Sequence, residues 1–212
     1  MSILEMKNLQ YAYENGKPVL RDINAQMEQS KMYAILGPSG CGKTTLLSLL
    51  GGLDSPTNGQ ILYQGEDISL TGLANHRRSH VAFIFQSYNL IDYLTPLENV
   101  SLTSKVPSLP ILEQLGLTNE ESKRNVLKLS GGQQQRVAIA RALASNAQVI
   151  LADEPTGNLD EDTADEITAI LKDSAHTSGK SVVIVTHSNA LAKQADVVLR
   201  LKKGVLYTQE IK

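Results

Sequence analysis

The sequence KMYAILGPSGCGKTTLLSLL, at Lys31–Leu50, joins a short apolar segment, a glycine-rich loop and a leucine-rich segment. The apolar segment predicts a buried strand that ends at Gly37, and a helix is predicted from about Gly42. A phosphate-binding loop requires this order of strand, glycine loop and helix. The stretch therefore indicates an α/β fold that holds a phosphate group at the start of a helix.

The loop itself, GPSGCGKT at Gly37–Thr44, matches the pattern G-x-x-x-x-G-K-[ST]. Its glycines permit backbone angles that other residues resist, so that successive N–H groups converge on a β-phosphate. The ammonium group of Lys43 is predicted to reach the β- and γ-phosphates, and the Thr44 hydroxyl to coordinate Mg²⁺. Cys41 is interpreted as a small space-filling residue. The residues predicted to contact the nucleotide here are Gly37, Pro38, Ser39, Gly40, Cys41, Gly42, Lys43, Thr44 and Thr45.

On both sides of the loop, segments typical of strands alternate with segments typical of helices. This alternation predicts a mostly parallel sheet that is covered on both faces. A hairpin is expected near the end of the chain, with its turn at Lys203–Gly204. Strands are predicted at residues 2–13, 18–27, 31–36, within 56–68, and at 80–86, 147–153 and 180–188; helices are predicted from about residues 42 and 130, and at 162–175.

The segment of residues 88–128 differs in texture from the rest of the chain. Three prolines interrupt the pattern there, and two short helical stretches follow. We interpret the segment as a mainly helical lobe inserted into a single domain that spans residues 1–212. The prolines are Pro96, Pro107 and Pro110, and the helical stretches are residues 109–116 and 119–129.

Composition argues against several classes of function. The chain has 212 residues, a net charge of −2 and 42% hydrophobic residues, which suits one domain with a core. Such a charge creates no strong field that would attract nucleic acid or anionic lipid. Cys41 is the single cysteine of the sequence, so no internal disulfide is expected, and this fits a reducing compartment. We find no secretory signal pattern and no apolar run of roughly eighteen residues, so a membrane role would require a partner.

An acidic pair follows a second short apolar strand. The sequence VILADEP ends this strand with Asp153 and Glu154. Ligands of open parallel sheets bind beyond the carboxyl ends of the strands. Asp153 is therefore predicted to hold Mg²⁺ through water, and Glu154 to orient or deprotonate the attacking water. A solvated acidic turn is the alternative, and the neighbouring phosphate loop makes it the weaker interpretation.

Two further polar residues lie at the ends of predicted strands. Gln86 ends HVAFIFQ and His187 ends VVIVTH, so both are expected near the nucleotide, with His187 contacting the γ-phosphate. The other three histidines are interpreted as structural or surface residues. In particular, HRRSH at His76–His80 is expected to be a solvated helix face, because it lacks the interleaved aromatic residues typical of nucleic-acid binding.

A second candidate anion site lies far along the chain from the first. The sequence LSGGQQQRVAIARAL, at Leu129–Leu143, begins with a Ser-Gly-Gly turn that opens a predicted helix. Free backbone N–H groups and the positive end of the helix dipole favour an anion at such a turn. The chain therefore has two candidate phosphate sites, and the second needs an explanation.

Together these segments resemble the ATP-binding-cassette ATPases over essentially the whole chain. GPSGCGKT resembles the Walker A motif, LSGGQ at Leu129–Gln133 the signature motif, and VILADE the Walker B motif. Gln86 corresponds to the Q-loop, NLD at Asn158–Asp160 to the D-loop, and His187 to the H-loop. The resemblance implies a RecA-like P-loop NTPase core with an antiparallel β-subdomain and an inserted helical subdomain.

In this family two cassettes pack head to tail, so that the phosphate loop of one faces the signature turn of the other across ATP. The resemblance therefore implies that a second copy of the chain is a partner and that hydrolysis needs both. Tyr13, rather than Tyr11, is expected to stack on adenine. ATP and Mg²⁺ are the implied cofactors. The implied catalytic residues are Glu154, His187, Gln86 and Lys43; the implied Mg²⁺ ligands are Thr44, Gln86 and Asp153; the further nucleotide contacts are Ser130, Gly131, Gly132, Gln133 and Asp160.

Within the family, the chain resembles the branch of macrolide exporters, lipoprotein-release ATPases, antimicrobial-peptide resistance transporters and the cell-division ATPase. The resemblance implies a cytoplasmic ATPase on the inner face of the membrane that powers export or extraction through separate integral membrane permease subunits. Those subunits are expected to dock near residues 86–100, where Tyr88, Leu90, Tyr93 and Leu94 offer apolar surface. Two alternatives stay open: an ATPase that signals through a membrane partner without transport, and a cassette acting on ribosomes or DNA. No nucleic-acid partner is expected.

Overall fold

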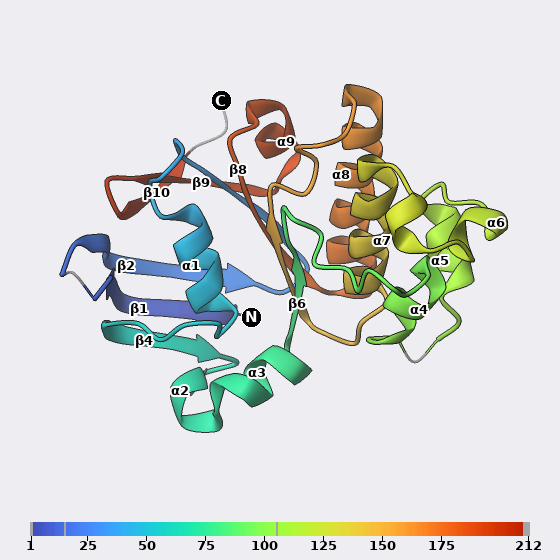
Figure 1. Ribbon diagram of the computed structural model, residues 1–212. Coiled ribbons are helices and arrows are strands. Elements are labelled where there is room, and N and C mark those ends of the chain that lie inside the picture. Colours follow the sequence, from blue (N-terminus) through green and yellow to red (C-terminus); the bar gives the residue numbers. More distant parts are fainter. Residues whose placement is uncertain (1, 15, 105, 210–212) are drawn as a thin grey trace.

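The computed structural model describes residues 2–14, 16–104 and 106–209, with a mixed sheet at its centre (Figure 1). Six strands of these residues form the central sheet in the order β10-β9-β3-β8-β7-β6, and all neighbours are parallel except β9 and β10. The prediction of a mostly parallel sheet is confirmed. The strands are β3 (Met32–Leu36), β6 (Val81–Ile84), β7 (Val149–Asp153), β8 (Ser181–Thr186), β9 (Val197–Lys202) and β10 (Val205–Gln209).

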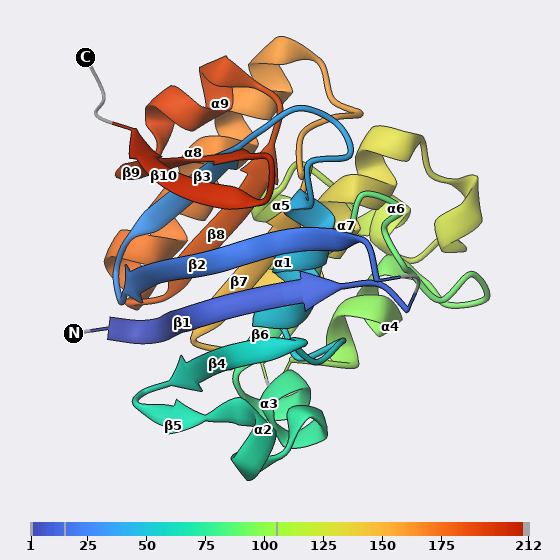
Figure 2. The same ribbon diagram turned by 90° about the vertical axis from the view of Figure 1, so that its left-hand side faces the viewer.

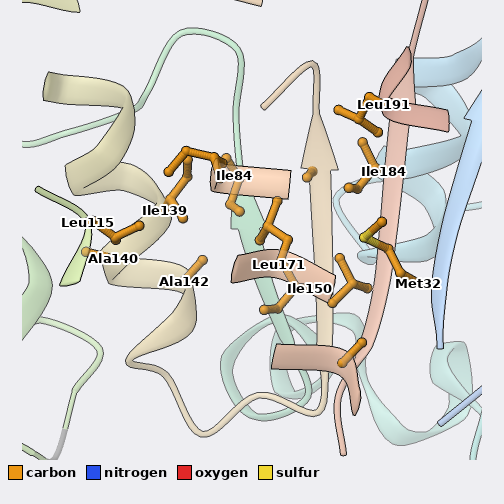
Figure 3. Close-up of a cluster of buried hydrophobic side chains, with 14 of the residues drawn as sticks. Met32, Ile84, Leu115, Ile139, Ala140, Ala142, Ile150, Leu171, Ile184 and Leu191 are labelled. Atoms are coloured by element: carbon orange, nitrogen blue, oxygen red, sulfur yellow. The ribbon is translucent and has the colours of Figure 1, made fainter. Parts of the chain in front are cut away.

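Alternate residues of the central strands pack on opposite faces of this sheet. In β3, Met32 and Ala34 belong to the hydrophobic cluster on one face, whereas Tyr33 and Ile35 belong to the cluster on the other. Every residue of β3, β7 and β8 is buried, as expected for parallel strands covered on both sides. Figure 3 shows one of these clusters, in which side chains of the sheet meet those of the helices.

One face of the central sheet is covered by an antiparallel sheet and by α1 (Lys43–Leu50). The antiparallel sheet has the order β2-β1-β4-β5, and Figure 2 shows it with α1 behind it. Leucines of α1 share a hydrophobic cluster with β1 and β2. The connection between the strands predicted at residues 2–13 and 18–27 includes residue 15, which lies outside the described residues. The strands are β1 (Ser2–Ala12), β2 (Pro18–Glu28), β4 (Asn58–Tyr63) and β5 (Glu66–Asp67).

The opposite face is covered by α7 (Gly131–Leu143), α8 (Glu161–Ser178) and α9 (Asn189–Gln194). Side chains of all three helices belong to the second hydrophobic cluster, so α1 and α7 lie on opposite sides of the central sheet (Figure 1). The two helices that follow the candidate anion sites are therefore separated by the full thickness of the sheet.

Between β6 and α7 the chain is mainly helical. Pro96 is the first residue of one helix, and Pro110 lies in the first turn of another. These prolines separate short helices, because a proline at a helix start lacks only an N–H that would have no helical partner. The elements are α4 (Pro96–Ser101), α5 (Leu109–Gln114), α6 (Asn119–Ser122) and a 3₁₀ turn, η1 (Val126–Lys128).

The expectation of a solvated helix at residues 76–80 is wrong for His76. Helices α2 (Ile68–Thr71) and α3 (Leu73–Ser79) follow β5, and the side chain of His76 is fully buried. Its Nε2 lies 3.0 Å from the carbonyl oxygen of Leu50 at the end of α1, and its Nδ1 lies 3.2 Å from Nδ1 of His80. The last carbonyls of a helix need donors, and a buried imidazole N–H supplies one here.

Candidate active site

The first candidate anion site lies between β3 and α1, at the carboxyl end of a buried strand. Gly42 is the N-cap of α1 and has a φ of 102°, a conformation that side chains resist; among the described residues, no side chain caps this helix. Gly37 is required by space, because a Cβ atom there would lie 2.6 Å from both Cys41 Sγ and the Leu201 carbonyl oxygen. The loop therefore presents backbone N–H groups where the helix dipole favours an anion.

Lys43 and Thr44 begin α1 and contact two different segments. The Lys43 ammonium donates to the carbonyl oxygens of Gly37, at 2.7 Å, and Pro38, at 3.2 Å, so that it lies over the loop. The Thr44 hydroxyl donates to Oδ2 of Asp153, the last residue of β7, at 2.8 Å. A positive charge and a hydroxyl–carboxylate pair are therefore placed on either side of the start of α1.

The Thr44–Asp153 pair has the chemistry of a magnesium site. Asp153 is buried, and this burial raises the pKa of its carboxyl group, against the lowering effect of the Thr44 hydrogen bond. Within the described ranges, no group of three or more His, Cys, Asp or Glu side chains is placed to hold a metal. Mg²⁺ needs no such group, because it takes one or two protein oxygens and completes its shell with water and phosphate oxygens. The pair therefore fits Mg²⁺ bound together with a nucleotide.

Glu154 is held in place by its backbone and by two side chains of the neighbouring strand. Its φ is 47°, a left-handed value that is uncommon for a residue with a side chain, and its N–H donates to the carbonyl of Val185 at 3.0 Å. Oε2 accepts a hydrogen bond from Thr186 at 2.9 Å, and Oε1 lies 2.8 Å from Nδ1 of His187. The His187 side chain remains 73% exposed. A fixed carboxylate beside an exposed imidazole can accept a proton from water.

Thr186 is a member of this group that sequence reasoning missed. It is the last residue of β8 and the sole hydroxyl residue in VVIVT, directly before His187. A polar residue at the end of such an apolar strand is a signal that could have identified it. Its bond to Glu154 requires the register in which Asp153 pairs with Val185, and that register is a property of the folded sheet.

A cleft of about 700 Å³ opens beside the phosphate loop, and Tyr13 lines it together with residues 40–45. Tyr13 is 51% exposed, and its hydroxyl lies 3.2 Å from Oγ1 of Thr45. Tyr11 instead donates its hydroxyl to Asp54, and this hydrogen bond raises the pKa of Tyr11 to about 12. The rings of Tyr11 and Tyr13 meet edge to face, with centroids 5.3 Å apart. Tyr13 is therefore an exposed ring at the cleft, and Tyr11 packs against it.

The second candidate anion site is the start of α7. Ser130 caps the helix by accepting a hydrogen bond from the Gln133 N–H at 3.3 Å, and Gln133 Oε1 accepts one from the Ser130 N–H at 2.9 Å. This exchange leaves the N–H groups of Gly131 and Gly132 without helical partners. Gln133 also donates to Glu121 in α6 at 2.7 Å. No hydrogen bond within the described ranges joins this turn to the phosphate loop.

Residues 158–160 lie beside the second site. A Cβ atom on Gly132 would lie 3.3 Å from Cδ2 of Leu159, so the Leu159 side chain packs against the backbone of Gly132. The carboxylate of Asp160 caps α8 by accepting from the Thr163 N–H at 3.0 Å, and this bond lowers the pKa of Asp160. Within one chain, Asp160 is therefore a helix cap at the edge of the second site.

Gln86 is the predicted site residue that the structure leaves apart. The strand β6 ends at Ile84, so Gln86 lies in the turn two residues further on, and its side chain is exposed. The predicted strand of residues 80–86 is too long because β6 is an edge strand whose pairing with β7 stops at Ala152. Across residues 2–14, 16–104 and 106–209, the Gln86 amide has no hydrogen-bond partner, and the structure does not bring it to Thr44 or Asp153.

Sequence comparison shows which known proteins this chain resembles. A family model described as "ABC transporter" matches residues 20–157. The uncharacterized ABC transporter ATP-binding protein YclH of Bacillus subtilis is 43% identical over 99% of this chain and 98% of its own length. The macrolide export ATP-binding/permease protein MacB 2 of Aeromonas hydrophila is 41% identical over 95% of this chain, which covers 33% of that longer protein.

Solved structures agree with the sequence comparisons. The dimeric structure of MJ0796, an ABC transporter cassette, matches with a TM-score of 0.90 and 35% identity over 99% of both chains; the MJ0796 sequence is from Methanocaldococcus jannaschii. A structure of MJ0796 in a post-hydrolysis state, bound to ADP and phosphate, matches with the same score. Both comparisons cover the two candidate anion sites described above.

Proposed function

We propose, on the premise that this chain belongs to the ABC transporter family, that two copies of it hydrolyse ATP at shared sites and drive a membrane partner. The chain is an ATP-binding subunit of this family and an ATPase, homologous to transporter cassettes. One observation carries the proposed mechanism. The phosphate loop follows β3, His187 follows β8 and Glu154 follows β7, and these three strands are neighbours in the sheet.

The proposed nucleotide lies between Tyr13 and the start of α1. Its adenine stacks on the exposed ring of Tyr13, and its phosphates accept hydrogen bonds from the backbone N–H groups of residues 39–45. A phosphate in the loop offers the Lys43 ammonium a charged acceptor in place of the two carbonyls that it now contacts. The 700 Å³ cleft is in the size range of cofactor sites.

Thr44 and Asp153 would hold Mg²⁺, which neutralises charge on the phosphate oxygens when it is bound. The hydrogen bond between these two side chains already places both oxygens on one side of the loop. Gln86, the third predicted ligand, is exposed in the turn after β6, and in this proposal it contacts the nucleotide-bound Mg²⁺ from that turn.

Glu154 is the proposed base for hydrolysis. Its carboxylate takes a proton from water as the water oxygen bonds to the γ-phosphorus, and the bond from that phosphorus to the bridging oxygen of ADP breaks. Thr186 and His187 keep the carboxylate oriented, and the remaining nitrogen of His187, Nε2, faces the γ-phosphate in this proposal. The ATP that is split therefore needs no further base from a partner.

The second copy supplies the signature turn. Within one chain α1 and α7 lie on opposite faces of the sheet, so the N–H groups of Gly131 and Gly132 do not face the phosphates bound by the same chain. In a head-to-tail pair, Ser130, Gly131 and Gly132 meet the γ-phosphate held by the partner. The match to a cassette structure described as dimeric supports this arrangement.

We place the membrane partner in a groove of about 580 Å³ between β6 and the helical segment; its lining includes Arg77, Phe83, Phe85 and Arg141. No helix of the described ranges is both long and apolar enough to cross a membrane. The related MacB 2 is described as combining ATP-binding and permease functions. We propose that separate permease subunits play that part here and hold the chain at the inner face of the membrane.

The residues that line this groove lie outside the predicted docking segment of residues 86–100. Tyr93 is 80% exposed and is available to a partner, whereas Leu90 packs against the hydrophobic core. The expected apolar surface consisted of Tyr88, Leu90, Tyr93 and Leu94. Because Leu90 packs against the core, the exposed apolar surface is smaller than expected.

The concentration dependence of hydrolysis tests the proposal. Because the complete site needs two chains, phosphate release per chain is expected to rise with protein concentration at saturating ATP and Mg²⁺, until dimerisation is complete. A rate per chain that is independent of concentration, in a sample shown by sedimentation to be monomeric, would contradict the shared site.

A further inference from the structure

Three segments that lie far apart in the sequence meet at one oxygen atom, the hydroxyl of Tyr88. Asn158 donates its side-chain N–H to this oxygen at 3.0 Å. On the other side, a Cβ atom on Gly131 would lie 3.1 Å from the same oxygen, closer than a methyl group normally approaches. Asn158 and Gly131 are both exposed, and Tyr88 is partly buried beneath them. The hydroxyl therefore supports two surface segments from below.

The backbone that carries this ring is held in an unusual conformation. Tyr88 and Asn89 have φ values of 63° and 49°, both in the left-handed region. The guanidinium of Arg141 donates to both of their carbonyls, at 3.0 Å to Tyr88 and 2.6 Å to Asn89. Arg141 belongs to α7, the helix that begins at Gly131. The backbone of Tyr88 is therefore hydrogen-bonded to α7 near the end of the helix, and its hydroxyl lies against Gly131 at the beginning of the same helix.

Helix α7 also holds the far end of the segment that contains Asn158. Arg136 donates to the hydroxyl of Thr163 at 3.2 Å and to the carbonyl of Leu115 at 3.3 Å. Thr163 in turn is tied to Asp160 through the helix cap of α8. Residues 158–160 are thus anchored to α7 at one end by Tyr88 and at the other by Arg136.

We infer that Tyr88 is a positioning residue whose hydroxyl sets the spacing between the signature turn and residues 158–160. This inference rests on the proposed function, because both segments form the surface that meets the nucleotide of the second copy. With the spacing fixed, Gly131 and Leu159 reach the partner as one rigid surface. Without the hydroxyl, Asn158 loses its acceptor, and the two segments must be ordered when the dimer forms, which weakens association.

The experiment uses Tyr88→Phe in the Glu154→Gln chain, so that hydrolysis does not disturb the equilibrium. Dimerisation at saturating ATP and Mg²⁺ is expected to weaken roughly three- to tenfold by sedimentation, the range for one neutral hydrogen bond. ATP affinity measured at protein concentrations that keep the chain monomeric, and the melting temperature, are expected to stay unchanged. Tyr207→Phe is the matched control, because it removes the hydroxyl of an exposed tyrosine in β10, to which no role in binding or catalysis is assigned.

A double-mutant cycle with Asn158→Ala shows whether the hydroxyl acts through this partner. In the Asn158→Ala chain, the further change Tyr88→Phe is expected to have no additional effect on dimerisation. A Tyr88→Phe chain that dimerises as well as its parent, or effects of the two changes that multiply, would overturn the inference alone. Absence of any ATP-dependent dimer in the Glu154→Gln parent would instead overturn the proposed function and this inference with it.

Discussion

The turns at Gly37–Thr44 and Ser130–Gln133 each start a helix, but they offer different chemistry. The first follows a fully buried strand, has left-handed Gly42 at the helix start and carries Lys43. The second closes its own cap, because the side chains of Ser130 and Gln133 take each other's N–H groups, and it carries no lysine.

This difference indicates how the work is divided between the two turns. Only the first turn combines a full positive charge with a row of free N–H groups, so it can bind a triphosphate by itself. The second offers two N–H groups and a hydroxyl, which suits a phosphate whose charge is already neutralised elsewhere. In the proposed dimer, the first turn would therefore bind the nucleotide, and the second would contact a phosphate that another chain holds.

The largest effect is expected from Glu154→Gln, which removes the proposed base and leaves both turns intact. Phosphate release should fall about a thousandfold while ATP binding persists, so that ATP keeps the two turns joined. Phosphate release and sedimentation with ATP and Mg²⁺ measure the two effects. Glu161→Gln, the same change at an exposed residue in the first turn of α8, is the control and should behave as the unchanged chain.

If the Glu154→Gln chain stays monomeric at saturating ATP, the two turns do not share a nucleotide. If it hydrolyses ATP at the normal rate, Glu154 is not the base, although the division of work between the turns would survive.

Changing one turn at a time tests whether the two turns have different roles in ATP binding and hydrolysis. Lys43→Ala should weaken ATP binding about ten- to a hundredfold, because charge-assisted hydrogen bonds to the phosphates are lost. Ser130→Arg should leave ATP binding by the monomer unchanged and suppress hydrolysis, because the bulk meets only the nucleotide of a second chain. Titration at low protein concentration measures binding, with Lys202→Ala as an exposed control for the loss of a lysine.

An equal loss of ATP binding in the Lys43→Ala and Ser130→Arg chains would mean that both turns act on one nucleotide within a single chain. That result would remove the reason for a dimer.

The smallest effect concerns the far end of α1, where His76 contacts the Leu50 carbonyl. Burial lowers the pKa of His76, with a smaller contribution from His80 and Arg77, so the folded chain protonates it less readily than the unfolded chain does. Below the ordinary histidine pKa of about 6.5, His76 is protonated more fully in the unfolded chain than in the folded chain. Acidification from pH 7 therefore lowers the free energy of unfolding.

Melting temperatures measured between pH 7 and pH 5 test this contribution. The loss of stability over that range should be smaller by a few degrees in a His76→Leu chain, which has no proton to take up at that position. A pH dependence identical to that of the unchanged chain would show that His76 is protonated in the fold.

Much of the fold could be predicted because its signals are local. The strand, loop and helix at residues 31–50 follow from an apolar run and a glycine–lysine pattern that lie within one stretch. Helices α4 and α9 escaped prediction; each has six residues, so a helical period shows weakly, although α5, of the same length, was predicted from residues 109–116. The burial of His76 depends on the end of α1, which no local pattern contains.

The same distinction between local signals and contacts set by packing applies to the candidate site. Residue types and strand ends predicted Asp153, Glu154 and His187 at one edge of the sheet, and the structure brings them to the carboxyl ends of β7 and β8. The contacts of Thr186 and Tyr88 could not be predicted, because each joins segments whose relative position is set by packing. The exposed turn of Gln86 depends on where β6 leaves the sheet.

The most direct test is the structure of the Glu154→Gln chain with ATP and Mg²⁺, in which the distance from the Gly131 nitrogen to the γ-phosphate is measured in every pairing of chains. The N–H group of Gly131 is expected to donate a hydrogen bond to the γ-phosphate that is held by Lys43 of the other copy. A Gly131 that lies far from any phosphate, in every pairing, would contradict it.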